Sequence, residues 1–492
     1  MRVAFIAAEC EPWAKTGGLG DVVDALARAL GRQPGRRVDA PVDVFLPRYR
    51  SVPVPRAAST TRTLRVPDPT APSGQTEVGI VDVEGNGYRL RLVDHPAAFD
   101  RDGFYGDATG DYPDNAWRFG LFNRAALEAL RLDPQPPDLI HLHDWHAAPA
   151  VLYRDGWYVD DAAIARAAVL LSLHNLAYHG WTPRERFPEL GLPPSDRLMA
   201  TARDGLDLLA AGIDRAELVN TVSPGYAAEA LTPEYGMGLD DRLRAKGDGF
   251  FGILNGLDTE VWNPGTDADL AARYSRDDLA GKAVARRDLL ATVGLDPDDA
   301  GPVLGMIGRL DPQKGFDLLT GAAERLVRRG AQLVVLGTGD PRLVAGLREL
   351  ATVHPDRVAL VERFDRVLAR KIYAGNDLFV MPSRFEPCGQ GQMIALRYGS
   401  PPIVRLTGGL ADTVVDEKRN PGAGTGFVFD PATPDALYAA CDAAIELFET
   451  GGAAWQSLVR RGMAVDFDWT TGSAPRYVAA YERAIAIRRA TG

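Results

Sequence analysis

Residues 3–26 read VAFIAAECEPWAKTGGLGDVVDAL, and this stretch decides the fold. It begins with a short apolar run, continues through a loop that holds Lys15 and several glycines, and ends in apolar residues with helical spacing. A strand that leads through such a loop into a helix is typical of a parallel α/β sheet. Because glycines at a helix entrance let backbone N–H groups approach an anion, the stretch predicts a phosphate-binding loop. A glycine-rich turn with a solvated lysine is the alternative.

The spacing of the glycines excludes two familiar nucleotide sites. It matches neither G-x-G-x-x-G, which binds dinucleotides, nor G-x-x-x-x-G-K, which binds nucleoside triphosphates.

Along the rest of the chain, short β-branched apolar runs alternate with longer helical patterns, which predicts parallel sheets with helices on both faces. A turn-rich segment at residues 251–265 separates two successive sheets, so we expect a hinge there. The Pro- and Thr-rich residues 51–75 are interpreted as irregular surface. The predicted strands are 3–7, 41–46, 88–93, 138–142, 168–173 and 217–220, then 303–307, 332–336, 358–361, 377–381 and 402–404.

Composition limits the class of protein and its partners. The 492 residues are 46% hydrophobic and 25% charged, which is typical of a globular chain with ample material for a core. A net charge of −11 argues against nucleic acid, because proteins that bind it cluster Lys and Arg. No apolar run reaches the roughly 20 residues of a membrane span. Three scattered cysteines and an N-terminus without a signal-peptide pattern favour the cytoplasm.

Open parallel sheets bind ligands where strands end, and two strand ends in the first half are rich in polar residues. One continues into HDWH, residues 143–146, and the other into HNLAYHG, which begins at His174. Asp144, Trp145 and His146 suit a sugar, because aromatic faces pack on pyranose rings and carboxylates accept hydroxyl hydrogen bonds. A metal site is the alternative for the histidines, although no second ligand cluster follows. For His174 the alternative is a core histidine.

Three loops of the second half also follow predicted strands. GRLDPQKG places Arg309 and Lys314 five residues apart before a helix, which suits a diphosphate; solvated surface cations are the alternative. PSRFEPCG places Glu386 before another helix, where a carboxylate can hold sugar hydroxyls or merely cap the helix. TGGLADT, from Thr407, can supply backbone amides to the same anion.

The ordered set of these motifs resembles the bacterial glycogen synthases of the ADP-glucose type, which are related to plant starch synthases. The resemblance spans nearly the whole chain and implies an α/β fold of two Rossmann-like domains that face a cleft, the GT-B type. The implied domains are 1–260 on the acceptor side and 261–468 on the donor side, with a helix in 469–492 that crosses back to the first domain. The motifs are KTGGLGDV from Lys15, HDWH from His143, HNLAYHG from His174, NGLD from Asn255, GRLDPQKG from Gly308, PSRFEPCG from Pro382 and TGGLADTV from Thr407.

The resemblance also implies a reaction. Glucose passes from ADP-glucose to the 4-hydroxyl at the non-reducing end of an α-1,4-glucan, with retention of configuration and without a metal or other cofactor. The implied catalytic residues are Glu386, Arg309, Lys314 and His174. The implied donor-binding residues are Lys15, Gly17, Gly18, Asp21, Asn255, Phe364, Cys388, Gly389, Thr407, Gly408 and Gly409. The implied acceptor-binding residues are Asp144, Trp145, His146 and Asn175.

Two of the implied donor residues have a simpler interpretation. Phe364 stands where the family offers an aromatic ring for the base, and a plain core phenylalanine is the alternative. Cys388 is expected to line the donor pocket, and a small buried thiol is the alternative.

One motif departs from the family. Where the family reads EPCGLTQLY, this chain reads EPCGQGQMI, so Gln390, Gly391 and Ile394 replace Leu, Thr and Tyr. Gly391 loses a hydroxyl and Ile394 cannot hydrogen-bond a ribose, so a related transferase that uses UDP-glucose or another acceptor is the alternative. A catalytically silent glucan-binding protein is disfavoured, because the expected cations and Glu386 are present. Nothing in the sequence indicates an oligomeric state.

Overall fold

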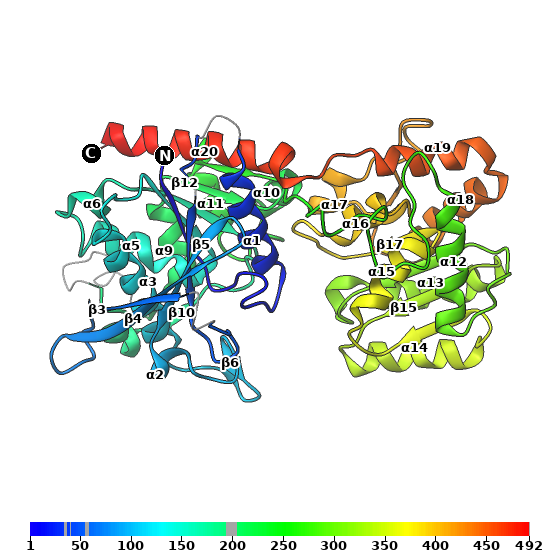
Figure 1. Cartoon of the computed structure of the whole chain (residues 1–492). Coiled ribbons are helices and arrows are strands. Elements are labelled where there is room, and N and C mark those ends of the chain that lie inside the picture. Colours follow the sequence, from blue (N-terminus) through cyan, green and yellow to red (C-terminus); the bar gives the residue numbers. More distant parts are fainter. Residues whose placement is uncertain (34–36, 40, 55–58, 193–203, 492) are drawn as a thin grey trace. The chain divides into compact units, whose positions relative to one another are not determined.

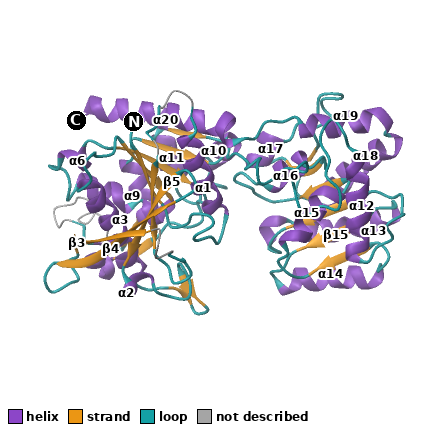
Figure 2. Ribbon diagram, in the orientation of Figure 1, coloured by secondary structure: helices purple, strands orange, loops and turns teal. Residues whose placement is uncertain are grey.

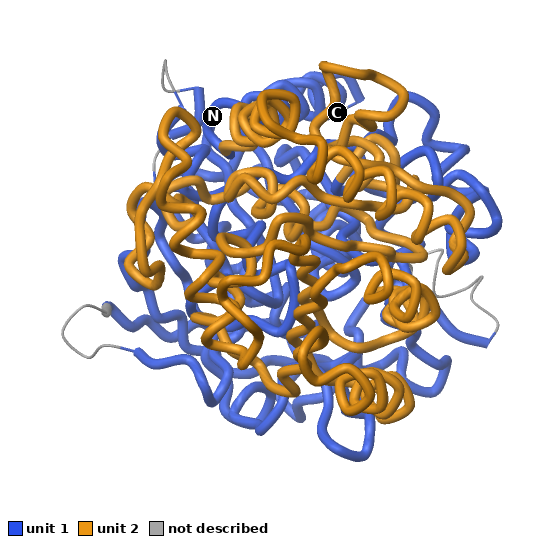
Figure 3. The backbone as a smooth tube through the Cα atoms, turned by 90° about the vertical axis from the view of Figure 1, so that its right-hand side faces the viewer, with its two compact units in different colours: residues 1–222, 227–256, 469–492 blue, residues 223–226, 257–468 orange. Residues whose placement is uncertain are grey.

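The structure is a computed structural model that describes residues 1–33, 37–39, 41–54, 59–192 and 204–491. The chain forms two compact units, which Figure 3 colours separately. The first comprises Met1–Val222, Ala227–Gly256 and Trp469–Gly492, and the second comprises Ser223–Tyr226 and Leu257–Asp468. In each unit, helices flank a sheet of its own (Figures 1 and 2).

The first unit is built on a nine-stranded sheet with the order β13-β12-β9-β8-β1-β2-β5-β4-β3. Neighbours from β13 to β5 are parallel, and β4 and β3 add an antiparallel hairpin at one edge. β1 is fully buried, as expected for a central strand covered on both faces. The strands are β1 (Val3–Ile6), β2 (Val42–Pro47), β3 (Ser59–Pro67), β4 (Gln75–Glu84), β5 (Tyr88–Asp94), β8 (Leu139–His143), β9 (Ala168–Leu173), β12 (Leu218–Thr221) and β13 (Phe250–Gly252). Two short pairs, β6 (Gly106–Asp107) with β7 (Gly110–Asp111) and β10 (Trp181–Pro183) with β11 (Gly205–Asp207), lie outside this sheet.

Two helices of the first unit shape the site. α1 (Gly18–Gly31) starts inside the glycine loop and buries the apolar face that its helical spacing predicts. α20 (Ala474–Thr491), the red C-terminal helix of Figure 1, packs against β8, β9 and α1, and its buried Tyr477 and Tyr481 face the sheet side. The other α-helices among the described residues of this unit are α2 (Pro96–Phe99), α3 (Asn115–Arg131), α4 (Asp144–Ala147), α5 (Pro149–Asp155), α6 (Ala162–Ala165), α7 (Phe187–Leu190), α9 (Leu208–Arg215) and α11 (Asp240–Ala245). The helix α10 (Pro224–Ala230) is divided, since residues 224–226 belong to the second unit and residues 227–230 to the first.

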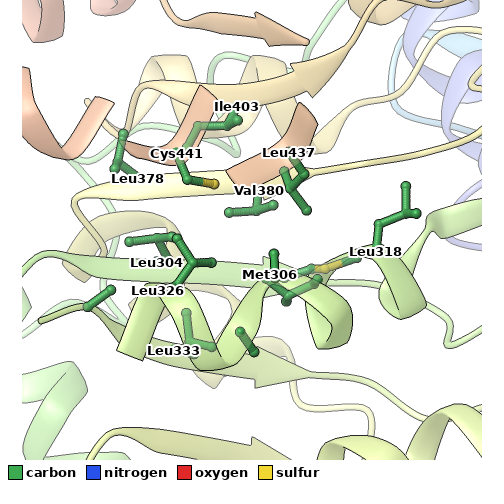
Figure 4. Packing of buried hydrophobic residues seen from close by; sticks show 14 of the residues in the cluster. Leu304, Met306, Leu318, Leu326, Leu333, Leu378, Val380, Ile403, Leu437 and Cys441 are labelled. Carbon is green, nitrogen blue, oxygen red and sulfur yellow. The ribbon is translucent and has the colours of Figure 1, made fainter. Parts of the chain in front are cut away.

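The second unit is built on a six-stranded, fully parallel sheet with the order β16-β15-β14-β17-β18-β19. Successive side chains of β14 point to opposite faces: Leu304 joins the core under α13 and α18 (Figure 4), and Val303 joins the core under α12 and α15. The strands are β14 (Val303–Ile307), β15 (Gln332–Leu336), β16 (Val358–Val361), β17 (Leu378–Met381), β18 (Pro402–Arg405) and β19 (Phe427–Phe429). The helices are α12 (Ala280–Val293), α13 (Phe316–Arg328), α14 (Pro341–Val353), α15 (Arg366–Gly375), α16 (Gly391–Arg397), α17 (Gly408–Thr413), α18 (Pro434–Thr450) and α19 (Gly452–Met463).

The prediction of two successive parallel sheets is confirmed, but the interpretation of residues 51–75 as irregular surface is wrong. Residues 59–67 form β3, which pairs with β4 at the sheet edge. Buried Leu64 and Val66 alternate there with exposed Thr63 and Arg65, so the strand has one apolar face. Residues 55–58 lie outside the described part of the chain.

A helix that spans a membrane must be both long and predominantly apolar. None of the helices in the described ranges is long and apolar enough to do so.

Candidate active site

Each sheet has a switch point, a strand from which the chain builds the sheet first to one side and later to the other. In the first unit β1 lies between β2 and β8, and in the second β14 lies between β15 and β17. Ligands of open parallel sheets bind at the carboxyl ends of strands beside such a switch point. The loops after β1, β8, β14 and β17 carry most of the predicted site residues, so each unit places its candidates at this favoured edge.

The glycine loop after β1 is organised around the buried carboxylate of Glu9. Thr16 donates its backbone N–H and its hydroxyl to Glu9 at 2.7 and 2.6 Å, and the Gly17 N–H donates at 3.0 Å. The hydroxyl of Tyr105 donates to the same carboxylate at 2.6 Å. Two amides of the predicted phosphate loop are therefore bound by a protein carboxylate. The sequence analysis did not identify Glu9. The one sign of its role in the sequence is the position of an acidic residue soon after a buried strand.

The two glycines at the entrance of α1 face open space. A Cβ atom built on Gly17 or Gly18 would meet no atom within 4 Å. Gly17 has φ −145° and ψ −164°, an extended conformation that any residue adopts. The packing of the protein itself therefore does not require glycine at either position.

Lys15 is held by two carboxylates of the same loop. Its Nζ lies 2.6 Å from Oδ1 of Asp21 and 3.3 Å from Oε2 of Glu11, and its side chain is 40% exposed. Burial acts to lower the pKa of Lys15, but the attraction of Asp21 and Glu11 outweighs it, so the pKa is raised. Lys15 therefore stays cationic, and Asp21 holds its ammonium group in place.

Asp144 joins the loops that follow β8 and β9. It has a positive φ of 59° and accepts the backbone N–H of His174 at 2.7 Å. Burial raises the pKa of Asp144 to about 7, against the lowering effect of hydrogen bonds from the backbone of His174 and Asn175. The Asn175 side chain accepts the N–H of Ala177 at 2.9 Å, which closes a local turn.

Trp145 and His146 are packed inside the first unit. They are 8% and 7% exposed, and their ring centroids lie 4.0 Å apart. A Cβ on Gly180 would come within 2.2 Å of the Trp145 ring, so the backbone of residue 180 covers part of the indole. Burial lowers the pKa of His146 to about 3. Tyr178 lies two residues before Gly180 in the loop after β9, and its side chain is 64% exposed. It therefore offers the open aromatic face that the buried Trp145 lacks.

His174 contacts His143 directly. Nε2 of His174 lies 3.0 Å from Nδ1 of His143, and the two rings stack with their centroids 5.3 Å apart. Burial lowers the pKa of His174 to about 3, so the imidazole is neutral at neutral pH. In the part of the chain that the structure describes, no group of three or more His, Cys, Asp or Glu is arranged to hold a metal ion.

In the second unit, Asp311 organises the loop that carries both predicted cations. Its Oδ2 lies 2.7 Å from Nε of Arg309, and its Oδ1 accepts the backbone N–H of Lys314 at 3.0 Å. Arg309 is an exposed cation, since its side chain is 72% exposed. Gly315 has φ +71°, and a Cβ there would lie 2.2 Å from the carbonyl oxygen of Pro382. Glycine is therefore required where the loops after β14 and β17 meet.

Glu386 and Lys314 form the most closely bound pair of the second unit's site. Nζ of Lys314 lies 2.6 Å from Oε2 of Glu386, and the hydroxyl of Ser383 donates to the same oxygen at 3.0 Å. Among the described residues, Oε1 of Glu386 has no hydrogen-bond partner. One carboxylate oxygen is thus fixed by the protein and the other is left for a ligand. Ser383 was missed by sequence reasoning, although it lies inside the PSRFEPCG motif.

The loop 407–409 packs onto the loop that carries Glu386. The backbone N–H of Gly409 donates to the carbonyl oxygen of Glu386 at 3.0 Å, and a Cβ on Gly409 would lie 2.3 Å from the carbonyl oxygen of Cys388. The amide of Gly409, which the sequence suggested for an anion, therefore holds two loops together. Cys388 is 5% exposed. The other donor-binding residues predicted for these two loops are Gly389, Thr407 and Gly408.

Phe364 and Asn255 occupy opposite extremes of exposure. Phe364, in the loop after β16, is 90% exposed, which excludes the alternative of a core phenylalanine. Asn255 is 7% exposed, and its Oδ1 is buried without a hydrogen-bond partner among the described residues. The orphaned oxygen of Asn255 is unusual, because buried polar atoms are nearly always hydrogen-bonded. The exposed ring of Phe364 is open to a ligand.

The departures in the EPCG motif are explained by packing. A Cβ on Gly391 would lie 3.1 Å from Sδ of Met381 and 3.2 Å from the ring of Phe379, so neighbours fill the space of a larger side chain. Ile394 is 4% exposed and lies within α16. Ile394 is therefore a core residue of the second unit, and Gly391 is a half-buried residue beside core side chains.

Comparisons with known proteins agree across the whole chain. A family model described as the starch synthase catalytic domain matches residues 2–245, and a model described as glycosyl transferases group 1 matches residues 301–446. The glycogen synthase of Syntrophotalea carbinolica is 42% identical over 507 residues, covering 100% of both chains. The glycogen synthase of Anaeromyxobacter dehalogenans is 43% identical over 489 residues, covering 98% of this chain and 99% of the relative.

Solved structures give the same result. The catalytic domain of starch synthase IV from Arabidopsis thaliana, bound to ADP and acarbose, matches with a TM-score of 0.86 and 35% sequence identity. The match covers 99% of each chain. The fold of both units is thus that of a known group of enzymes.

Proposed function

The chain belongs to the glycogen and starch synthase family of glycosyltransferases, and from this membership we propose that its donor is ADP-glucose and its acceptor the non-reducing 4-hydroxyl of an α-1,4-glucan. The family assignment, the GT-B type fold and the hexosyltransferase activity follow from relatives above 40% identity that align over the full length. The resemblance seen in the motifs is thereby confirmed. The choice of donor and the roles of single residues are our proposals.

One observation carries the choice of donor. The starch synthase IV catalytic domain, 35% identical over 99% of this chain, was solved with ADP bound. The two replacements that cast doubt on ADP-glucose fit their surroundings in this chain, because neighbouring side chains crowd Gly391 and Ile394 is buried. UDP-glucose is therefore the second choice.

The leaving diphosphate needs positive charge, and we assign it to Arg309 and Lys314. Arg309 is exposed, and its Nη atoms have no partner among the described residues, so the guanidinium can bind phosphate oxygens through two N–H groups. Lys314 is a point charge beside Glu386. Fixed cations that face the departing diphosphate stabilise the transition state without rearranging, and the proposed reaction needs no metal.

The transferred glucose is held by hydrogen bonds. We assign Oε1 of Glu386 to the sugar hydroxyls, because Oε2 is already bound by Lys314 and Ser383. We assign His174 to the same glucosyl group. The bond between C1 of the glucose and the donor phosphate oxygen breaks, and the nucleoside diphosphate leaves. The acceptor oxygen forms the new glycosidic bond to C1 on the same face of the sugar and gives its proton to an oxygen of the departing phosphate.

The remaining donor residues bind the nucleotide and its phosphates. Lys15 and the open backbone at Gly17 and Gly18 suit a phosphate, since no protein atom needs the space over the glycines. Phe364 offers its exposed ring to the base. Asp21 orients Lys15, and the buried Oδ1 of Asn255 is an acceptor for the nucleotide. Cys388, Gly389, Thr407, Gly408 and Gly409 shape the pocket wall.

We propose that the glucan binds beside the loops after β8 and β9. Asp144 and Asn175 set the shape of these loops, and Trp145 and His146 support them from inside. We place the reaction in the cytoplasm, a reducing compartment, since none of the three cysteines is in a disulfide.

The test is nucleoside diphosphate release with glycogen as acceptor, with ADP-glucose and UDP-glucose at equal concentration and no added metal. We expect ADP release that depends on glycogen and clearly exceeds UDP release. Release from UDP-glucose alone would reject the proposed donor and keep the family.

A further inference from the structure

Three neutral histidine rings are packed in series at the carboxyl edge of the first unit's sheet. The centroids of His141 and His143 lie 4.1 Å apart, and those of His143 and His174 lie 5.3 Å apart. Burial lowers the pKa of His141 and His143 well below 6.5 and that of His174 to about 3. Each ring therefore carries one N–H, on one of its two nitrogens.

The proton of His141 is placed by the groups that surround it. The Asn220 side-chain NH₂ donates to the carbonyl oxygen of Thr221 at 3.3 Å, so its Oδ1 faces Ser172 and accepts the Ser172 hydroxyl at 2.6 Å. The Ser172 oxygen must then accept from Nε2 of His141, at 2.6 Å. Nδ1 of His141 is left as an acceptor, and the hydroxyl of Tyr481, on α20, donates to it at 2.9 Å.

The pair of His143 and His174 shares a single proton across its 3.0 Å contact. Nε2 of His143 is buried and has no hydrogen-bond partner in the described part of the chain. If Nδ1 of His143 were the acceptor, its proton would sit on Nε2 as an orphaned buried N–H. Such donors are rarer in folded proteins than unsatisfied acceptors. His143 therefore donates from Nδ1 to Nε2 of His174, and the proton of His174 lies on Nδ1.

The neighbours of His143 keep its ring in this orientation. The ring is fully buried and packs against His141 and Phe5, with centroids 4.1 and 5.1 Å away. Phe5 is itself 0% exposed, and His141 is anchored by Tyr481. Rotation of His143 would require space that a close-packed interior does not offer.

We propose that His143 is a positioning residue that fixes His174 as its Nδ1–H tautomer, so that His174 donates a hydrogen bond to an oxygen atom of the donor sugar. Among the described residues, Nδ1 of His174 has no partner, so this donor is left for a ligand. The inference rests on the proposed function, in which His174 contacts the glucosyl group. It adds the direction of that hydrogen bond and the residue that sets it.

The first test is the tautomeric state of each ring in the ligand-free enzyme. The chain has seven histidines, so ¹⁵N-histidine labelling gives a spectrum that single substitutions can assign. We expect two-bond ¹⁵N–¹H correlations to show Nδ1–H for His143 and His174 and Nε2–H for His141. An Nε2–H tautomer at His174 would overturn the proposal. This measurement needs no donor, so it is independent of the proposed function.

The second test compares two substitutions of His143. His143→Leu keeps an apolar shape and removes the donor, whereas His143→Asn places an amide N–H near the position of Nδ1. We expect His143→Leu to lower kcat at least about tenfold, because an unfixed imidazole tautomer is a poor catalyst, with the glucan KM little changed. His143→Asn is expected to restore most of kcat and the Nδ1–H signal of His174.

The outcomes separate the inference from the proposed function. Full kcat in a folded His143→Leu variant, or an Asn variant as slow as the Leu variant, would overturn the positioning role and leave the donor proposal intact. If His143→Leu does not fold, the Asn variant alone decides by its His174 signal and kcat. No ADP release by the wild-type enzyme would reject the proposed function and with it the sugar contact. His95→Asn, at a half-buried histidine that packs against Trp117 outside the site, serves as the control for loss of a histidine.

Discussion

The ammonium group of Lys314 lies 2.6 Å from Oε2 of Glu386, and this pair ties the loop after β14 to the loop after β17. Because Ser383 binds the same oxygen at 3.0 Å, the carboxylate cannot turn, and Oε1 keeps one direction. A catalytic group that is held by neighbours in this way needs no reorganisation when substrate arrives. The pair is therefore the centre of the proposed chemistry in the second unit.

Glu386→Ala should lower kcat by roughly 100-fold or more while the enzyme stays folded, because the glucose loses its positioning group. Rates of ADP release and a thermal melt measure the two effects. Glu362→Ala, which breaks a surface pair with Arg348, is the matched control and should leave kcat unchanged. Normal turnover in Glu386→Ala would remove Glu386 from the site.

Arg309→Ala should reduce kcat/KM for the donor without a measurable change in stability. The side chain is 72% exposed, and its pair with Asp311 contributes at most about 1 kcal/mol. Arg309→Lys should restore activity only in part, since an ammonium group cannot bind two phosphate oxygens through a planar fork. Arg342→Ala, at a 90% exposed arginine paired with Asp340, is the control. Equal kinetics in both alanine variants would contradict the assignment.

Phe364→Ala should raise KM for ADP-glucose several-fold and leave the melting temperature unchanged. The ring is 90% exposed, so its removal costs the fold almost nothing, whereas a stacked base would lose apolar contact. Phe364→Tyr should behave like the wild type. Val353→Ala, at another exposed apolar residue of the second unit, controls for surface hydrophobicity. An unchanged KM in Phe364→Ala would show that the base binds elsewhere.

Gly17→Ala should fold normally and use the donor poorly. The added methyl group meets no protein atom within 4 Å and needs no positive φ, so we expect stability within about 1 kcal/mol of the wild type. A phosphate that approaches the backbone would meet that methyl group. Gly472→Ala, which also adds a methyl group in open space, should keep full activity. Donor kinetics that are the same in both variants would make the glycine loop a simple turn.

Asp144→Asn should change how stability depends on pH. Burial raises the pKa of Asp144 from 3.8 in its ordinary state to about 7, so between these values the folded state binds a proton that the unfolded state has released. The free energy of unfolding of the wild type should therefore fall, relative to the variant, as pH rises through this interval. Asparagine accepts the same N–H from His174 and tolerates the positive φ. Denaturant titrations at several pH values across this interval measure the free energy of unfolding of both proteins. A constant difference between wild type and variant at all these pH values would contradict the prediction.

The sequence predicted the parts of the fold that repeat one simple pattern. Strands such as 168–173 and 303–307 are buried and almost wholly apolar, with Ser172 as their one polar residue, because both faces of the sheet are covered. The hairpin of β3 and β4 was missed, since an edge strand with one buried face mixes Thr and Arg among its apolar residues. Pattern reading finds the buried centre of a sheet more readily than its edge.

The candidate site was also predicted only in part. Strand ends predicted which loops carry Lys15, Arg309, Lys314 and Glu386, because in each of the two sheets parallel topology collects the strand ends at one edge. The sequence did not predict that Glu9 binds two amides of the glycine loop, or that Gly409 donates to the carbonyl oxygen of Glu386. Such contacts depend on which loops meet in space, which local patterns do not contain.

The most direct test of the account is the product of the wild-type enzyme with ADP-glucose and a short maltooligosaccharide, followed by ¹H NMR and mass spectrometry. We predict a ladder of products that grows by single glucose units, with new anomeric signals of α-1,4 linkages and one ADP released for each unit. Release of ADP without elongation, or elongation through another linkage, would contradict our proposal that this chain is an α-1,4-glucan synthase that uses ADP-glucose.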